Sequence, residues 1–174
     1  MNIRRAKHSD AASLAALSIE VWVGTYLRKG ISEFFADYVL SEFTKASFER
    51  LLVDANEIFF VSENLDGIDG FIRISRGRKA PVEGCSATEI STLYVQPRHQ
   101  RKGIGGKLLD TAMAHCARLG VDSVWLTTNS ENTPAIGYYL SRGFVKCGVT
   151  NFRIGDQAYP NDVLSLAIEA DRVG

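Results

Sequence analysis

One stretch of the chain, 93–109, constrains the fold more than any other. An apolar, β-branched run ends at Val95, a proline and a basic segment follow, and a helical pattern then begins through Gly103, Gly105 and Gly106. This order predicts a strand, a loop and the N-terminus of a helix. The first amides of a helix have no intrahelical acceptor and lie at the positive end of its dipole. The stretch therefore predicts an anion site for a phosphate or pyrophosphate.

Two common nucleotide motifs do not fit this stretch. A P-loop needs a serine or threonine after its lysine, whereas Lys107 is followed by Leu108, and Arg101 stands where the first glycine should be. A dinucleotide-binding fingerprint needs its third glycine at the position of Leu108. Arg98 and Lys102 add positive charge to the segment. The pattern favours a phosphate ligand of another kind.

The composition is typical of a globular protein. The 174 residues fit a single domain, 1–174, since 45% of them are hydrophobic and 23% are charged. Lys plus Arg and Asp plus Glu each number 20, so no global field draws the chain to nucleic acid or to a membrane. The cluster of positive charge is confined to residues 98–107, which suits a small polyanion.

We expect a cytoplasmic protein without a metal. No apolar run is long enough to span a bilayer, and the charged start lacks the apolar segment of a signal peptide. Cys85, Cys116 and Cys147 are widely spaced and form no paired motif. This spacing suggests neither a disulfide framework nor a zinc site.

Helical and strand patterns follow one another along the chain. The predicted helices cover 11–26, a stretch around 34–39, 44–53, 103–119 and 132–142. The predicted strands cover 2–6, 57–63, 68–75, 87–95, 122–128, 144–153 and 162–168. Strands alternate with helices only in the second half, so we expect an α+β fold with a mixed sheet flanked by helices.

Several residues have the chemistry of helix ends. Ser9 or Asp10 is predicted to cap the first helix, and Thr44 the third. Asn132 precedes the last helix, and Gly120 follows the helix that begins at the glycines.

The loop before the long glycine-rich helix also carries a family resemblance. Gln100-x-x-Gly103-x-Gly105 resembles the acyl-CoA pyrophosphate motif of the GCN5-related N-acetyltransferase (GNAT) superfamily, in which Gln/Arg-x-x-Gly-x-Gly/Ala joins a strand to its helix. The resemblance implies the GNAT fold. In that fold a central, mixed, mostly antiparallel sheet of about seven strands has a splayed parallel pair that holds acetyl-CoA.

A second motif resembles the same superfamily. Asn132-x-x-Ala135, followed by Tyr138-Tyr139-x-x-x-Gly143-Phe144, is similar to its second signature and stands at the usual distance after the glycine loop. Two ordered motifs with a strand between them are more specific than either alone. The resemblance covers 87–144.

The resemblance implies acetyl-CoA as the cofactor and assigns its contacts. Backbone groups near the end of the 87–95 strand would pair with the pantetheine arm as an added strand does. Asn132 would bond the pantetheine or would only cap its helix, and both interpretations stay open. The implied acetyl-CoA residues are Leu93, Tyr94, Val95, Gln100, Arg101, Lys102, Gly103, Ile104, Gly105, Gly106, Asn132, Ala135 and Tyr139.

Acetyl transfer to an amine needs a base and an acid. An alkylamine, with a pKa near ~10.4, is protonated at neutral pH and cannot attack a thioester. Glu89 corresponds to the base glutamate of several superfamily members; the alternatives are a water chain and a solvated glutamate at the strand edge. Tyr139 occupies the family's general-acid position and would protonate the leaving thiolate, unless it only packs beneath the cofactor. Tyr138 is expected to pack.

The expected reaction is direct acetyl transfer from acetyl-CoA to a primary amine of a small molecule, in a ternary complex. The tail 152–156 faintly resembles that of polyamine-acetylating members, which makes a polyamine-like acceptor one expectation. The alternatives are acetylation of a protein N-terminus or lysine, and a non-catalytic acyl-CoA-binding sensor. A homodimer through the C-terminal strands is a further expectation.

The N-terminal helices are where acceptor specificity is expected. Their aromatic residues belong either to the core or to an acceptor pocket. Scattered carboxylates could attract a cationic amine, and the alternative for each of them is a solvated surface charge. The aromatic residues are Trp22, Tyr26, Phe34 and Phe35, and the carboxylates are Glu20, Glu33 and Asp37.

Overall fold

The computed structural model describes residues 1–27 and 29–168. Seven strands are hydrogen-bonded in the order β1-β2-β3-β4-β5-β7-β6. The pairing of β4 with β5 is parallel, with Glu89 opposite Trp125, whereas β1 with β2, β5 with β7 and β6 with β7 are antiparallel. The predicted fold class, a mixed and mostly antiparallel sheet flanked by helices, is confirmed.

The described chain forms two compact units, which we describe separately. The first consists of Met1–Ile74 and Thr92–Ala112, and the second of Ser75–Ser91 and the residues from Met113 onward. Strands β3 and β4 and helix α4 contribute residues to both units. No helix in the described ranges has the length and apolarity needed to cross a membrane.

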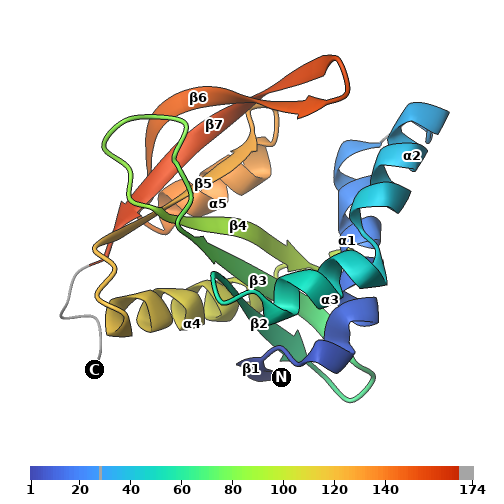
Figure 1. Ribbon diagram of the computed structural model, residues 1–174, viewed down its shortest axis with the longest axis horizontal. Coiled ribbons are helices and arrows are strands. Elements are labelled where there is room, and N and C mark those ends of the chain that lie inside the picture. The colour runs from blue at the N-terminus through green and yellow to red at the C-terminus, as the bar shows by residue number, and fades with distance from the viewer. Residues whose placement is uncertain (28, 169–174) are drawn as a thin grey trace. The chain divides into compact units, whose positions relative to one another are not determined.

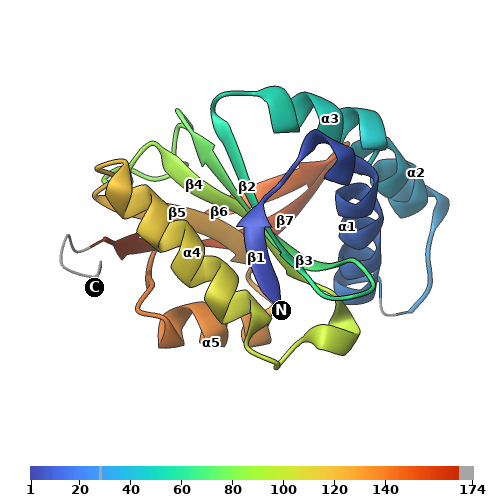
Figure 2. The ribbon, with the colours of Figure 1, turned by 90° about the horizontal axis from the view of Figure 1, so that it is seen from below.

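The first unit holds the N-terminal helices and strands (Figure 2). Its elements are β1 (Asn2–Arg5), a 3-10 turn (His8–Asp10), α1 (Ala11–Tyr26), α2 (Glu33–Glu42), α3 (Lys45–Val53), β2 (Glu57–Glu63), β3 (Ile68–Arg76), the end of β4 (Thr88–Val95), a second 3-10 turn (Pro97–His99) and the start of α4 (Ile104–Arg118). The predicted bounds of α1 and β2 are confirmed to the residue.

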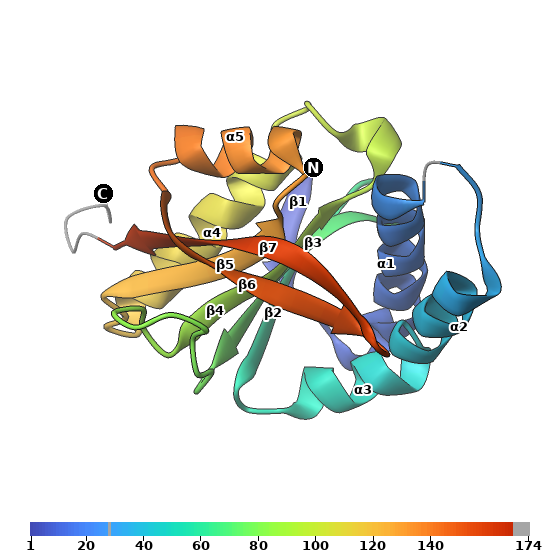
Figure 3. The same cartoon turned by 90° about the horizontal axis from the view of Figure 1, so that it is seen from above.

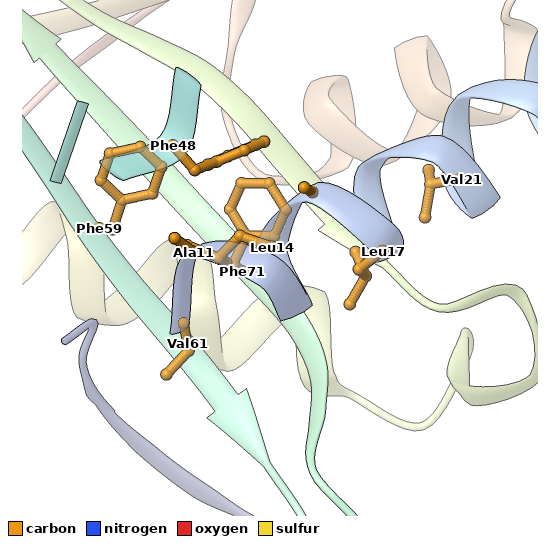
Figure 4. Close-up of a cluster of buried hydrophobic side chains, with 9 residues drawn as sticks. Ala11, Leu14, Leu17, Val21, Phe48, Phe59, Val61 and Phe71 are labelled. Atoms are coloured by element: carbon orange, nitrogen blue, oxygen red, sulfur yellow. The ribbon is translucent and has the colours of Figure 1, made fainter. Parts of the chain in front are cut away.

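The core of this unit lies between α1, α3 and the strands β2 and β3. Leu14, Leu17 and Val21 recur at helical spacing along α1 and are all buried. Figure 4 shows Phe48 of α3 close to Phe59 of β2 and Phe71 of β3, and the ring centroids of these three residues are 6.1–6.3 Å apart. Each such buried side chain contributes about 1.5–3 kcal/mol to folding.

The cap predictions for the first and third helices have opposite outcomes. Thr44 caps α3 as predicted, because its Oγ1 accepts from the backbone N of Ser47 at 3.0 Å. The prediction that Asp10 caps α1 is wrong. Its carboxylate instead accepts from the backbone N of Lys7 at 2.7 Å and from both terminal nitrogens of Arg4 at 2.7 and 3.1 Å. The ion pair to Arg4 therefore ties the first turn to β1.

Asp10→Asn is expected to lower the free energy of unfolding at pH 7 by about 1.5–3 kcal/mol, the usual range for a hydrogen bond to a charged group. The hydrogen bonds from Arg4 hold the pKa of the Asp10 carboxyl below its usual range. Since the folded pKa is lowered, this contribution is present above the unfolded pKa of about 3.9 and is lost as the pH falls through the folded value. Urea unfolding of both proteins from pH 7 to pH 2 measures the difference.

The matched control is Glu63→Gln, which removes the other carboxylate bonded to Arg4, at a solvated position. We expect a smaller effect from it, because solvent screens exposed ion pairs. A stability difference between wild type and Asp10→Asn that persisted at pH 2 would contradict the assignment to the ionised carboxylate.

The second unit contains the C-terminal strands, and Figure 1 shows β6 and β7 as a long two-stranded ribbon. Its complete elements are β5 (Ser123–Asn129), α5 (Thr133–Ser141), β6 (Val145–Ile154) and β7 (Gln157–Ala167). Its buried residues include Val124, Leu126, Phe144, Val163 and Leu164.

Strand β7 begins at Gln157 rather than at the predicted Asp162, because Pro160 does not interrupt it. The carbonyl of Pro160 accepts from the backbone N of Ser130 at 2.9 Å. The N–H and C=O of a strand residue point to the same side, so the backbone of Pro160 faces away from Asn151, its neighbour on β6. The missing N–H therefore removes no bond between β6 and β7.

Candidate active site

The predicted strand, loop and helix N-terminus are present. Strand β4 ends at Val95, and the loop that follows has positive φ angles at Arg101 (60°) and Gly103 (81°). Helix α4 begins at Ile104, and its first internal hydrogen bond runs from the backbone N of Lys107 to the Gly103 carbonyl at 3.1 Å. The backbone N–H groups of residues 104–106 therefore have no acceptor within the helix, and Gly103 before them has no side chain to cap them.

Two side chains anchor this loop to α1. The Glu20 carboxylate accepts from Gln96 Nε2 at 2.9 Å and lies 3.4 Å from Arg98 Nη2. The expectation that Glu20 attracts a cationic amine is thus corrected: it already holds the start of the loop. Glu33 and Asp37, the other two predicted carboxylates, are exposed on α2.

Further hydrogen bonds connect the loop to the strands. The backbone N of Gln96 donates to the Asp69 carbonyl of β3 at 2.9 Å. Gln100 Nε2 donates to the Val95 carbonyl at 3.2 Å, so the side chain of this motif residue closes the loop on its own strand. His99 Nδ1 lies 3.7 Å from Asp69 Oδ2. Residues 96–100 of the loop are therefore held in place by the protein itself.

A glycine on β3 lets α4 start close to the sheet. A Cβ on Gly70 would lie 3.0 Å from the Tyr94 carbonyl oxygen and 3.2 Å from side-chain carbons of both Ile104 and Leu108. Ile104 and Leu108 are buried. These contacts would be tighter than ordinary van der Waals contact, so a side chain here would require its neighbours to shift. Sequence analysis did not identify this position because a lone glycine in a strand has no specific signature.

The donors at the start of α4 fit a pyrophosphate. The amides of 104–106 are uncapped, and Arg101, Lys102 and Lys107 are exposed around them. A Cβ built on Gly103 or Gly106 meets no atom within 4 Å, so the backbone here is open to a ligand. Amide donors, a helix dipole and exposed cations together match the chemistry of a polyphosphate.

Glu89 lies on β4 within the second unit and is half-buried. Its Oε2 accepts from Ser91 Oγ at 3.2 Å, and Ser91 Oγ is 2.5 Å from Ser75 Oγ. A carboxylate joined to two hydroxyls can accept a proton and pass it along the chain of hydrogen bonds.

The second motif forms the start and end of α5. Asn132 Oδ1 accepts from the backbone N of Ala135 at 3.3 Å, so the capping interpretation of Asn132 is confirmed, whatever else its amide nitrogen binds. Tyr139 is half-buried, with its ring centroid 5.3 Å from that of Tyr138 and 5.5 Å from that of Phe144. These two rings hold the Tyr139 side chain in place.

Cys85 and Cys116 are poorly suited to act as nucleophiles at neutral pH. Burial, with a smaller effect from neighbouring Cys147, raises the pKa of the Cys85 thiol to about 11, and burial raises that of Cys116 to about 11. Both thiols are thus protonated at pH 7. In the described ranges, no three His, Cys, Asp or Glu side chains are grouped to hold a metal ion.

A cavity of about 330 Å³ lies in the first unit, between its helices and the end of β4. Its lining residues are Ser18, Glu42, Phe43, Ser47, Phe48, Arg50, Leu51, Arg73, Thr92 and Tyr94. Sequence analysis missed Arg50, Arg73 and Thr92, since only the packing of α3 against β3 and β4 brings them together.

The four predicted aromatic residues do not line this cavity. Trp22 is buried, and its ring centroid lies 5.2 Å from that of Tyr26 and 5.8 Å from that of Phe35. Phe34 contacts Phe35 at 5.3 Å. Figure 3 shows α2 beside α1, and these rings belong to the packing between the two helices. The core interpretation fits Trp22, whereas Phe34 and Phe35 are half-buried and Tyr26 is 40% exposed.

Solved structures with similar folds are acetyltransferases. The PaiA N-acetyltransferase from Thermoplasma acidophilum, solved with coenzyme A, superposes with a TM-score of 0.72 at 19% identity, covering 92% of this chain and 96% of that one. A GCN5-related N-acetyltransferase from Rhodopseudomonas palustris gives a TM-score of 0.74 at 17% identity, with 95% and 94% coverage. At this identity the likeness concerns the fold.

Two curated relatives with similar sequences are also acetyltransferases. N-alpha-acetyltransferase RimI of Mycobacterium tuberculosis is 33% identical over 105 residues, which are 60% of this chain and 62% of that protein. Streptothricin acetyltransferase of Streptomyces lavendulae is 32% identical over 97 residues, 55% of this chain and 49% of the relative. An uncharacterised Mycobacterium leprae protein, ML0378, is matched over only 27% of its length. The chain thus spans less than two thirds of each of these relatives.

The Acetyltransferase (GNAT) family model matches residues 24–144, more than half of the chain, and the chain belongs to this family.

Proposed function

We propose that this protein is an acetyl-CoA-dependent N-acetyltransferase that acts on a primary amine of a small molecule by direct transfer. The observation that carries the proposal is the uncapped N-terminus of α4, with its open glycine backbone and surrounding cations, in a chain of the GNAT family. Acetyl-CoA, when bound, supplies a thioester carbonyl that reacts with a neutral amine.

The cofactor contacts follow from the chemistry of each segment. Amides from Arg101 to Gly106 hold the pyrophosphate, with Lys102 as an added cation and Gln100 closing the loop. Backbone groups of Leu93, Tyr94 and Val95 pair with the pantetheine arm. In the second unit we assign the side-chain nitrogen of Asn132, the backbone of Ala135 and the ring of Tyr139 to the same ligand.

Two side chains move protons in the proposed reaction. Glu89 accepts the ammonium proton, directly or through water, and its hydrogen bond from Ser91 orients the carboxylate. Tyr139 Oη donates its proton to the departing sulfur. The raised pKa of the Cys85 thiol, about 11, argues against an acyl-enzyme at that residue.

The cavity in the first unit is our candidate for the acceptor site. Its volume suits a small molecule, and Glu42 faces the same space as Arg50 and Arg73. Arg73 is already paired with the buried Glu57 at 2.7 Å. Arg50 donates from Nη2 to Ser47 Oγ at 3.1 Å, and its remaining N–H groups are our candidate donors for an anionic group. These charges favour an amine that also carries a carboxylate, and they fit a fully cationic polyamine less well.

A peptide N-terminus is the second candidate acceptor. The 33% identity to an N-alpha-acetyltransferase supports it, whereas the 32% identity to streptothricin acetyltransferase supports a small molecule. A free amino acid and a peptide N-terminus both place an amine near a carbonyl group, so the cavity alone favours neither strongly.

The test is acetyl-CoA-dependent thiol release against a panel of amino acids, their decarboxylated amines, polyamines, aminoglycosides and short peptides. We expect release with amines that carry a carboxylate, and about a tenfold higher KM for them in Arg50→Gln, equivalent to about 1.4 kcal/mol. The decarboxylated amines serve as the internal control and should show no change in KM. Release with peptides alone would favour the second candidate.

A silent panel would be interpreted with calorimetry. Acetyl-CoA binding without turnover would favour the sensor interpretation over an enzyme. If the protein showed no acetyl-CoA binding and no turnover, the proposed function would be overturned.

A further inference from the structure

Two thiols from distant parts of the sequence lie side by side in the second unit. The Sγ atoms of Cys85 and Cys147 are 3.6 Å apart, although 62 positions separate the residues in the chain. Cys85 is on the loop between β3 and β4, and Cys147 is an exposed residue of β6. The sequence pattern suggested no disulfide framework, because spacing alone does not show that a loop and a strand meet.

The loop that carries Cys85 is fixed at the adjacent residue. Ser86 Oγ donates to the Ser123 carbonyl of β5 at 2.5 Å and accepts from the backbone N of Thr88 at 3.2 Å. The Ser86 carbonyl accepts from Trp125 Nε1 at 3.0 Å. These bonds hold the backbone beside Cys85 against β5, so the position of this thiol is determined by the fold.

A bulge in β6 sets the position of the second thiol. Lys146 and Gly148 pair with consecutive residues of β7, so Cys147 is the extra residue between them. Its Sγ lies 3.5 Å from the Val163 carbonyl. A Cβ on Gly148 would come within 2.5 Å of Val82 Cγ1, so the loop approaches β6 at a point where any larger residue would displace it. Features of both the loop and the bulged strand therefore bring the two thiols together.

We propose that Cys85 and Cys147 form a redox modification site, a dithiol that a small-molecule disulfide such as oxidised glutathione converts into an intramolecular disulfide. The exposed Cys147 thiolate attacks the small-molecule disulfide, forming a mixed disulfide and releasing one thiol. The Cys85 thiolate then attacks Cys147 Sγ and releases the second thiol. Two protein thiols are oxidised, one small disulfide is reduced to two thiols, and the two protein protons end on those products.

The order of the two steps follows from exposure. Cys147 is the more exposed thiol, and burial together with the contact to Cys147 raises the pKa of Cys85 to about 11. Cys85 is therefore the slower thiol, and it reacts because its partner is already within contact distance. The resulting disulfide closes a long loop and is expected to raise the Tm by about 5–10 °C.

The experiment treats the reduced protein with oxidised glutathione and follows free thiols, intact mass and Tm. We expect the three thiols to fall to one, the mass to fall by two hydrogen atoms, and a peptide map to join Cys85 with Cys147. Cys147→Ser should remain unmodified, and Cys85→Ser should stop at a stable glutathione adduct. Cys116→Ser, which removes the buried thiol, should still form the disulfide.

Two results would overturn the proposal. One is a stable glutathione adduct on wild-type Cys147 with no internal disulfide. The other is a disulfide that forms equally fast in native protein and in protein unfolded by urea, because native juxtaposition would then contribute nothing. If Cys116→Ser does not fold, peptide mapping of the oxidised wild-type protein still identifies which two cysteines form the disulfide. The outcome is independent of acetyl transfer.

Discussion

Gly105→Glu is expected to weaken acetyl-CoA binding about 100-fold, a loss of about 2.7 kcal/mol, while the protein stays folded. Gly105 is in the first turn of α4, where the proposed pyrophosphate binds amides of the helix N-terminus. A carboxylate there occupies the space of the ligand, repels its charge and neutralises the dipole that attracts it. Calorimetric titration with acetyl-CoA measures the effect.

The stability of the same variant should not fall. Replacing a helical glycine removes a cost of up to about 1 kcal/mol, and an acidic residue in the first turn interacts favourably with the helix dipole. Gly105→Gln is the matched control, with nearly the same size and no charge, and we expect it to bind with intermediate affinity. Unchanged acetyl-CoA affinity in Gly105→Glu would contradict the phosphate assignment.

Tyr139→Phe is expected to lower kcat about 100-fold, the lower end of the range for general acid catalysis, with little change in the KM for acetyl-CoA. The ring contacts with Tyr138 and Phe144 do not require the hydroxyl and persist in the variant. Steady-state thiol release measures both constants. The loss should diminish with a thioester whose leaving thiol has a lower pKa, because such a thiol departs without a proton.

Tyr138→Phe is the control for this prediction, since it removes a hydroxyl from the neighbouring position of the same helix. We expect it to keep kcat within about threefold of wild type. A large effect of Tyr138→Phe with none of Tyr139→Phe would move the acid role to Tyr138. No effect of either substitution would contradict the acid role altogether.

Much of the fold could be predicted because periodicity and local chemistry agree. In α1 the apolar residues recur at helical spacing, and in α4 they do so between a glycine-rich start and Gly120, whose φ is 69°. Thr44 and Asn132 cap the helices that follow them, since a short polar side chain needs only local backbone to do so. The glycine-loop motif likewise identified the strand, loop and helix of the proposed phosphate site.

The errors concern residues whose partners are distant in sequence. Asp10 resembles a helix cap, but its carboxylate binds Arg4 of β1. Glu20 resembles a surface charge, but Gln96 holds it. The predicted start of β7, Asp162, is five residues too late, and only the neighbouring strands show that the strand continues through Pro160. The cavity and the Cys85–Cys147 contact likewise depend on tertiary packing, which no local pattern encodes.

The most direct test of the account is initial-rate kinetics of thiol release with acetyl-CoA and the best amine of the panel both varied. Direct transfer in a ternary complex predicts that double-reciprocal lines intersect, and that no acetylated protein accumulates when the amine is omitted. Parallel lines, or a protein mass increased by one acetyl group without the amine, would show an acyl-enzyme and contradict the proposed mechanism.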